Sequence, residues 1–128
     1  MSFSADLSRH LGNTQDLAED LMQKVVVVSL QGIMSRTPVD TGRARANWNV
    51  SAGQPDLKVS ENTDAGEATN RGLAEAKQVS LRDRNVYISN NLPYSMRLEY
   101  GWSGQAPQGM VRVTAAEVRS LIQAGRLG

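Results

Sequence analysis

The feature that most constrains the fold is a row of mostly apolar residues near the N-terminus, spaced alternately four and three positions apart. Such spacing places its members on one face of an α-helix. Polar residues such as Asp16 and Glu19 fall mostly off that face. We therefore expect one long helix over residues 4–35, with Gly12 and Gly32 as the positions where it could break. The row consists of Leu7, Leu11, Thr14, Ala18, Leu21, Val25 and Val28.

The chain changes character after Thr37-Pro38, where the proline disfavours helical geometry in the residue before it. Residues 43–51 alternate small or apolar side chains with polar ones, a period of two that is typical of a strand. One face of this strand would end in a tryptophan, and the opposite face would carry Arg43 and Arg45. Residues 52–66 are rich in Gly, Pro, Asn and Asp and predict a mobile loop or hairpin.

The second half of the chain predicts shorter elements. Asn90 and Pro93 have the residue types of a helix cap and a first helical position, and Gly101 can end that helix in a left-handed conformation. The expected elements are a helix over 67–79, a strand over 86–89, a short helix over 93–100 and a C-terminal helix over about 108–124.

The C-terminal helix carries its own start signal. Thr114 and Glu117 have the spacing of a capping box, which places residue 114 at or near a helix N-terminus. For residues 110–113 a short strand is the alternative to an earlier helix start. Together these patterns predict a single α+β domain over residues 1–128, in which the long N-terminal helix packs on a small, mostly antiparallel sheet.

Composition narrows the possible functions. The chain has 128 residues, no cysteine and one histidine, and its 14 basic and 13 acidic residues give a formal charge of +1. Disulfides, thiolate metal sites and cysteine nucleophiles are thereby excluded, so we expect no metal and no cofactor. The first residues lack the pattern of a secretory signal, and no apolar run approaches the roughly 20 residues of a membrane span. We expect a soluble protein.

Catalytic groups are sparse. His10 lies in the long helix one turn after Asp6, which favours a solvated helix residue. Asp40 and Glu99 are the two acids set among turn residues, and a small hydrolase that uses them is the least supported hypothesis. Asp40 precedes Thr41-Gly42 as an Asx-turn residue does, which favours a structural role. We therefore expect no enzyme.

Arginine outnumbers lysine by 11 to 3. Arginine suits both phosphate recognition and bidentate pairing with carboxylates. A DNA-binding module that uses Arg36, Arg43 and Arg45 is one hypothesis. The near-zero net charge favours pairing within the chain or between subunits, with acids such as Asp40 or Glu99.

Aromatic residues cluster in one stretch. Four of the six lie between Tyr87 and Trp102. Tyrosine and tryptophan are the residues that most often anchor interfaces, so we expect this stretch to contribute to a contact surface.

Three segments, in this order and spacing, resemble the small tail-completion or minor tail proteins of long-tailed bacteriophages and prophages. The resemblance covers roughly residues 35–118, and the N-terminal helix matches in kind. Many relatives carry a larger apolar residue in place of Ala44 and a proline-aromatic pair in place of Gly109-Met110. The segments are Thr37-Pro38-Val39-Asp40-Thr41-Gly42-Arg43, Val86-Tyr87-Ile88-Ser89-Asn90-Asn91-Leu92-Pro93-Tyr94 and Leu98-Glu99-Tyr100-Gly101.

The resemblance implies a structural virion protein of the phage neck that helps to join the tail to the head. It would act without catalysis, as a homo-oligomeric ring through which DNA passes, and the symmetry of such tails favours a hexamer. Its partners would be further copies of itself, tail terminator or tail tube proteins and head-tail connector proteins, with no membrane. It would reside in the virion, and in the host cytoplasm during assembly. The residues expected to form the motif and its contacts are Pro38, Asp40, Thr41, Gly42, Arg43, Asn90, Pro93, Tyr94, Glu99, Tyr100, Gly101 and Trp102.

Overall fold

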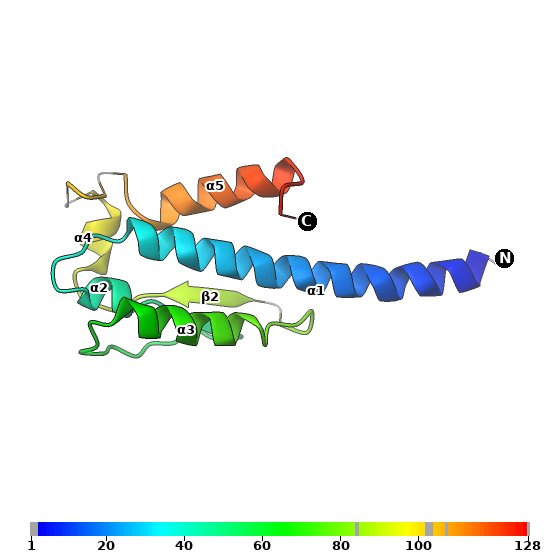
Figure 1. Cartoon of the computed structure of the whole chain (residues 1–128), viewed down its shortest axis with the longest axis horizontal. Helices are drawn as coiled ribbons and strands as arrows, with labels where there is room; N and C mark the ends of the chain where they lie inside the picture. The colour runs from blue at the N-terminus through cyan, green and yellow to red at the C-terminus, as the bar shows by residue number, and fades with distance from the viewer. Residues whose placement is uncertain (1–2, 84, 102–103, 107, 128) are drawn as a thin grey trace.

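The computed structural model describes residues 3–83, 85–101, 104–106 and 108–127, with side chains described from Leu17 onward. The fold is α+β, as expected (Figure 1). The longest helix, α1, lies between α5 on one side and a layer that contains α3 and β2 on the other. The elements in the described part of the chain are α1 (Phe3–Arg36), α2 (Arg43–Ala46), β1 (Asn49–Ala52), α3 (Ala65–Ala76), β2 (Val86–Ser89), α4 (Ser95–Glu99) and α5 (Val111–Gln123).

The sheet consists of two antiparallel strands in the described residues. β1 and β2 pair with Asn49 opposite Ser89 and Ala52 opposite Val86. The strand expected over residues 86–89 is therefore β2, and its partner comes from the end of the stretch expected as a longer strand. This small sheet packs against α1 and α3 rather than forming an independent layer.

The core is built on a face of α1 that differs from the predicted row. Val26, Leu30, Ile33 and Met34 are buried, and they pack with Trp48 and small residues of α3. The row members Ala18, Leu21, Val25 and Val28 are half-buried instead. Successive helix residues are rotated by about 100°. The core face begins at Val26, one residue after Val25 of the row, and is therefore rotated from the row by about 100°.

The strand expected over residues 43–51 is only partly correct. Residues 43–46 form the one-turn helix α2, and the strand begins at Asn49. Alternation is ambiguous over so few residues, and alanine and arginine both have high helix propensity. Gly42, at φ 89°, precedes the helix, and its left-handed backbone redirects the chain as α2 begins.

Two helix starts also differ from the expectation. The side chain of Asp64 accepts a hydrogen bond from the Glu67 backbone N–H at 3.1 Å, so α3 begins at Ala65 rather than at residue 67. The capping box at Thr114 is wrong, because α5 begins at Val111 and Thr114 lies buried inside it. The helical start at Val111 also overturns the alternative of a strand over 110–113.

Within the part of the chain that the structure describes, no helix combines the length and apolar character needed to cross a bilayer. The side chains of Asp6 and His10, and all of Trp102, lie outside the described residues.

Candidate functional site

The three segments that carry the resemblance meet at the end of α1 opposite its N-terminus, around α2 and α4 (Figure 1). There they border a groove of about 480 Å³. The turn after α1 supplies one wall, and α4 with the loop after it supplies the other. The lining residues are Pro38, Val39, Asp40, Thr41, Gly42, Arg43, Ala44, Tyr94, Leu98 and Gln105.

The base of the turn is fixed by Thr37, which is buried. Its hydroxyl donates to the Ile33 carbonyl at 2.7 Å and accepts from the Trp48 indole N–H at 2.9 Å. One side chain thus provides a hydrogen-bond partner both for a carbonyl in the last turn of α1 and for the indole N–H of the core tryptophan. The turn starts from a rigid base.

The Asx turn expected at Asp40 is wrong. The hydroxyl of Thr41, and not the carboxylate of Asp40, accepts the hydrogen bond from the Arg43 backbone N–H, at 3.2 Å. Asp40 is exposed beside the groove. Gly42 is required at its position, because a Cβ there would lie 2.7 Å from the Thr63 carbonyl oxygen and would force a side chain into positive φ.

Asn90 joins the second segment to α2. Its side-chain N–H donates to the Ala44 carbonyl at 2.8 Å, and its Oδ1 accepts from the Leu92 backbone N–H at 3.2 Å. The expected role as a helix cap is therefore wrong, since α4 begins at Ser95 and Tyr94 occupies the capping position without a side-chain bond. Pro93 is exposed and precedes the helix by two residues.

Gln105, which the sequence did not single out, closes the groove from a third segment. Its side chain bonds both backbone groups of Val39, accepting from the N–H at 2.9 Å and donating to the carbonyl at 3.2 Å. No local sequence signal marks such a long-range amide contact. The contact holds the turn against the chain that follows α4.

Glu99 connects α4 to α5. Its carboxylate accepts backbone hydrogen bonds from Met110 at 2.9 Å, Val111 at 2.8 Å and Arg112 at 3.0 Å. It thereby satisfies three N–H groups at the start of α5 and places negative charge at the positive end of the helix dipole. Arg112 Nε also pairs with it at 3.0 Å.

These bonds determine the ionisation of Glu99. Burial raises the pKa of the carboxyl, but the backbone hydrogen bonds from residues 110–112 and the Arg112 side chain outweigh burial and hold the pKa below its ordinary value. The carboxylate therefore stays ionised at neutral pH. Because each of its oxygens already accepts two bonds, the geometry suits a structural cap better than a general acid.

Gly109 makes this connection possible. Its φ is 87°, and a Cβ at this position would collide with the Glu99 carbonyl oxygen. The chain therefore needs glycine here to bring the α5 N-terminus onto Glu99. Gly101 has φ 83°, the left-handed conformation that was expected of it.

The exposed side chains near this junction are apolar and aromatic. Tyr94 is 36% exposed, Met96 63% and Tyr100 61%. The Arg112 guanidinium lies 4.8 Å from the centre of the Tyr100 ring, so an ion-paired residue also holds an exposed aromatic. The α4 end of the molecule thus presents large side chains on a firmly connected backbone.

The three arginines of the DNA-binding hypothesis all bind their own chain. Arg36 bonds the Thr114 hydroxyl at 2.9 Å and pairs with Glu117. Arg43 pairs with Glu61 at 3.0 Å, and Arg45 donates to the Thr37 carbonyl at 2.9 Å. The pairing acids are therefore Glu117 and Glu61, while Glu99 pairs with Arg112 and Asp40 with none of these arginines.

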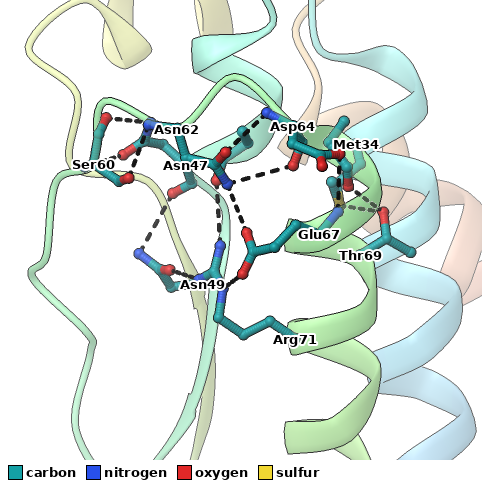
Figure 2. A network of polar contacts seen from close by, with 11 residues as sticks. Met34, Asn47, Asn49, Ser60, Asn62, Asp64, Glu67, Thr69 and Arg71 are labelled. Carbon is teal, nitrogen blue, oxygen red and sulfur yellow. Dashed lines mark hydrogen bonds and ion pairs between the residues drawn. The ribbon is translucent and has the colours of Figure 1, made fainter.

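The segment between β1 and α3 has no regular structure, yet side chains anchor it along its length. Asn47, which is buried, donates to the Ser60 carbonyl at 3.0 Å and accepts from the Ser60 N–H at 2.7 Å. The Asp56 carbonyl accepts from Ser89 Oγ at 3.0 Å and from Asn91 Nδ2 at 2.7 Å. Figure 2 shows Asn62 of this segment facing Glu67 of α3, and Asn49 of β1 facing Arg71 of the same helix.

No group of three or more His, Cys, Asp or Glu residues that could hold a metal occurs among the described side chains. Comparison with protein-family models, curated proteins and solved structures finds no match to this chain.

Proposed function

We propose that the protein is a structural component of the neck or tail of a long-tailed bacteriophage or prophage, where it completes the tail end and helps to join it to the head connector. The observation that carries this proposal is the convergence of the segments behind the resemblance. Residues 38–43 and Tyr94 lie about 50 positions apart in the sequence but line the same groove.

The groove has the properties of a contact surface. Its supporting polar groups are occupied by bonds within the chain, as at Thr37, Asn90 and Gln105. The neighbouring exposed side chains include Tyr94, Met96 and Tyr100, and residues of this kind contribute strongly to interfaces. A rigid backbone that presents apolar anchors loses little conformational freedom when it binds a partner.

In the proposed assembly, identical subunits meet head to tail and close into a ring, with six subunits favoured by the resemblance. One face of the ring would contact tail tube or terminator proteins, and the other would contact the connector. DNA would pass through the lumen. A near-neutral protein suits this passage, because a strongly basic lining would retain the DNA.

Deletion of the gene from the phage or prophage, followed by complementation, tests the proposal. We expect the deletion to yield unjoined heads and tails by electron microscopy, and the wild-type gene to restore joined particles. Tyr94→Ala should complement poorly. Leu57→Ala, at an exposed apolar residue outside the groove, is the matched control and should complement fully. Joined, infectious particles without the gene, or purified virions without the protein, would rule the proposal out.

DNA binding through Arg36, Arg43 and Arg45 has less support, because each of these side chains already has a partner in its own chain. A salt titration separates the two functions. Binding at moderate salt that is lost in Arg43→Ala and Arg45→Ala would favour the DNA-binding module.

A further inference from the structure

A second groove, of about 570 Å³, lies away from the turn after α1 and borders the C-terminal ends of α3 and α5. Its walls are the middle of α1, the end of α3 and the turn that follows α5. Figure 1 shows the chain after α5 turning back toward α1. We call this the basic groove, after the cations Lys24, Lys77 and Arg126 that line it.

Hydrogen bonds fix the walls of the basic groove. Gln23 of α1 donates to the Lys77 carbonyl at 3.2 Å and to the Val79 carbonyl at 2.8 Å, which holds the end of α3 against α1. At the end of α5, the Arg126 N–H bonds the Leu121 carbonyl at 2.9 Å, and Gly125 has φ 68°. This is the Schellman pattern, which reverses the chain after a helix. The groove is therefore formed before any partner binds.

The three cations make the groove a local centre of positive charge. They come from three separate elements, and all of them are exposed. In the described part of the chain none of the three has an ion pair. Asp20 is the one acid among the described lining residues. Because the whole chain is nearly neutral, this excess of positive charge is specific to the groove.

Helix ends explain only part of this charge. Lys77 and Arg126 follow the C-termini of α3 and α5, where a nearby cation is favourable. Lys24 lies inside α1, far from either end of that helix, and has no such role. Its presence beside the other two indicates a requirement of the groove itself.

Between the cations the groove is apolar. Its floor is formed by Val27 and Val28 of α1, together with Ala76 and Leu127. Ala76 is buried, and the other three are half-buried. An apolar floor flanked by unpaired cations complements a ligand that carries apolar groups between negative charges.

We propose that the basic groove binds an acidic, amphipathic segment of a partner protein. Its carboxylates would pair with the three cations, and one or two of its apolar side chains would cover the floor. A nucleic-acid backbone could meet the same cations, but phosphate contacts are polar and would leave the floor uncovered. The combination of charge and apolar surface therefore favours a protein segment.

The size of the groove sets the expected affinity. The α1 wall from Asp20 to Val28 spans about 12 Å, which matches about two turns of a bound helix. So short a contact supports a reversible complex, with a dissociation constant of about 10 to 300 µM. This inference does not rest on the proposed function, because binding is measured on the purified chain.

Fluorescence anisotropy with a labelled peptide tests the proposal. The probe is a peptide of about 14 residues with glutamates on one helical face and leucines on the other. We expect it to bind the full chain, and the affinity to fall as salt is raised. A scrambled peptide of the same composition should bind at least about fivefold more weakly, since it cannot place leucines and carboxylates together. A peptide with lysine in place of every glutamate should not bind.

Substitutions locate the site. Lys24→Glu and Lys77→Glu should each weaken binding by about tenfold, because each replaces an attraction by a repulsion. Arg82→Glu makes the same charge change at an exposed position outside the lining and should bind as the wild type does. Leu127→Ala should weaken binding by about fivefold through lost apolar contact. Circular dichroism should show all four variants folded.

Three results would overturn the proposal. The first is equal affinity for the patterned and scrambled peptides, or unchanged affinity in Lys24→Glu and Lys77→Glu. The second is tighter binding of a DNA duplex of about 20 base pairs that is lost in Lys24→Glu but kept in Leu127→Ala, which would assign the groove to nucleic acid. The third is self-association of the chain, measured by sedimentation, that Lys24→Glu abolishes, which would assign the groove to a second copy.

Discussion

The segment over residues 53–64 and the N-terminal part of α1 differ in opposite ways. The first has no regular secondary structure, but buried Asn47 and the side chains of Ser89 and Asn91 bind its backbone. The second is continuous helix, yet it extends beyond the rest of the fold in Figure 1. Tertiary anchoring, rather than regularity, therefore decides which part of this chain is held in place.

The strongest test of this comparison removes the main anchor of the irregular segment. Asn47→Ala deletes the paired bonds to Ser60 and a further bond to the Arg43 carbonyl, and it leaves a buried gap. We expect the free energy of unfolding to fall by about 3 kcal/mol. Denaturant titration measures the loss.

Trypsin cleavage after Lys58 should also become faster in Asn47→Ala. Lys58→Ala provides the control for stability, because Lys58 is exposed and its hydrogen bonds, to Asn49 and Asp56, use only its backbone. Unchanged stability in Asn47→Ala would show that the segment is not anchored as described.

A second test compares two glycines with the same backbone conformation. Gly109 and Gly53 have φ values of 87° and 86°, but a Cβ at Gly109 meets Glu99, whereas a Cβ at Gly53 meets nothing within 4 Å. Gly53→Ala should cost about 1 kcal/mol through its positive φ alone. Gly109→Ala should cost about 2 kcal/mol more, because α5 must also move. Equal losses of stability in the two variants, measured by thermal unfolding, would mean that the α4–α5 junction moves to accommodate the added Cβ without further cost.

A third test addresses the charge at that junction. Glu99→Gln should lower the free energy of unfolding by about 1 to 2 kcal/mol at pH 7, since the amide carries no negative charge and replaces one accepting oxygen with a donating NH2 group. Because the pKa of Glu99 is lowered in the folded state, this stabilisation is present above the ordinary glutamate pKa of about 4.3 and is lost as pH falls through the folded value.

The difference in stability between wild type and Glu99→Gln should therefore shrink below about pH 4. A difference that persists at pH 2 would assign the effect to packing instead of charge.

The smallest effect is expected in the projecting helix. Gly12→Ala should increase helical circular dichroism, because alanine favours a helix interior by about 1 kcal/mol over glycine. The free energy of global unfolding should change by less than about 0.3 kcal/mol, since we expect this part to unfold separately from the core. A full 1 kcal/mol gain in global stability would show that the projecting part belongs to the cooperative unit.

Local patterns predicted β2 and all the described helices except α2, because those elements are specified by neighbours in the sequence. The row of α1 correctly predicted a long helix, but it did not identify the buried face, which depends on where α3 and Trp48 pack. The error at residues 43–46 has a similar origin. A few alternating residues fit one helical turn as well as a strand, and here the hydrogen bond from the Ala46 N–H to the Gly42 carbonyl, at 2.9 Å, closes the helical turn.

The candidate site was predictable as a set of segments but not as a set of contacts. The motif residues near Pro38 and Tyr94 do meet at one groove. Glu99 stood out by its place among turn residues, yet its role as the cap of α5, which begins twelve residues later, depends on the path of the intervening chain. Gln105 and Asn47 were missed because an amide that binds distant backbone has the same sequence signature as one that faces water.

The buried hydroxyl of Thr37 holds the C-terminal end of α1 in place. Its hydrogen bonds join the last turn of the helix to the core tryptophan, beside the turn that follows α1. From there the 34 residues of α1 form a rod about 51 Å long. Core contacts hold α1 from Met22 to Met34, so only the part before Met22, about 28 Å long, can act as a lever. A bend of about 10° at Met22 would move the N-terminal end of the helix by about 5 Å.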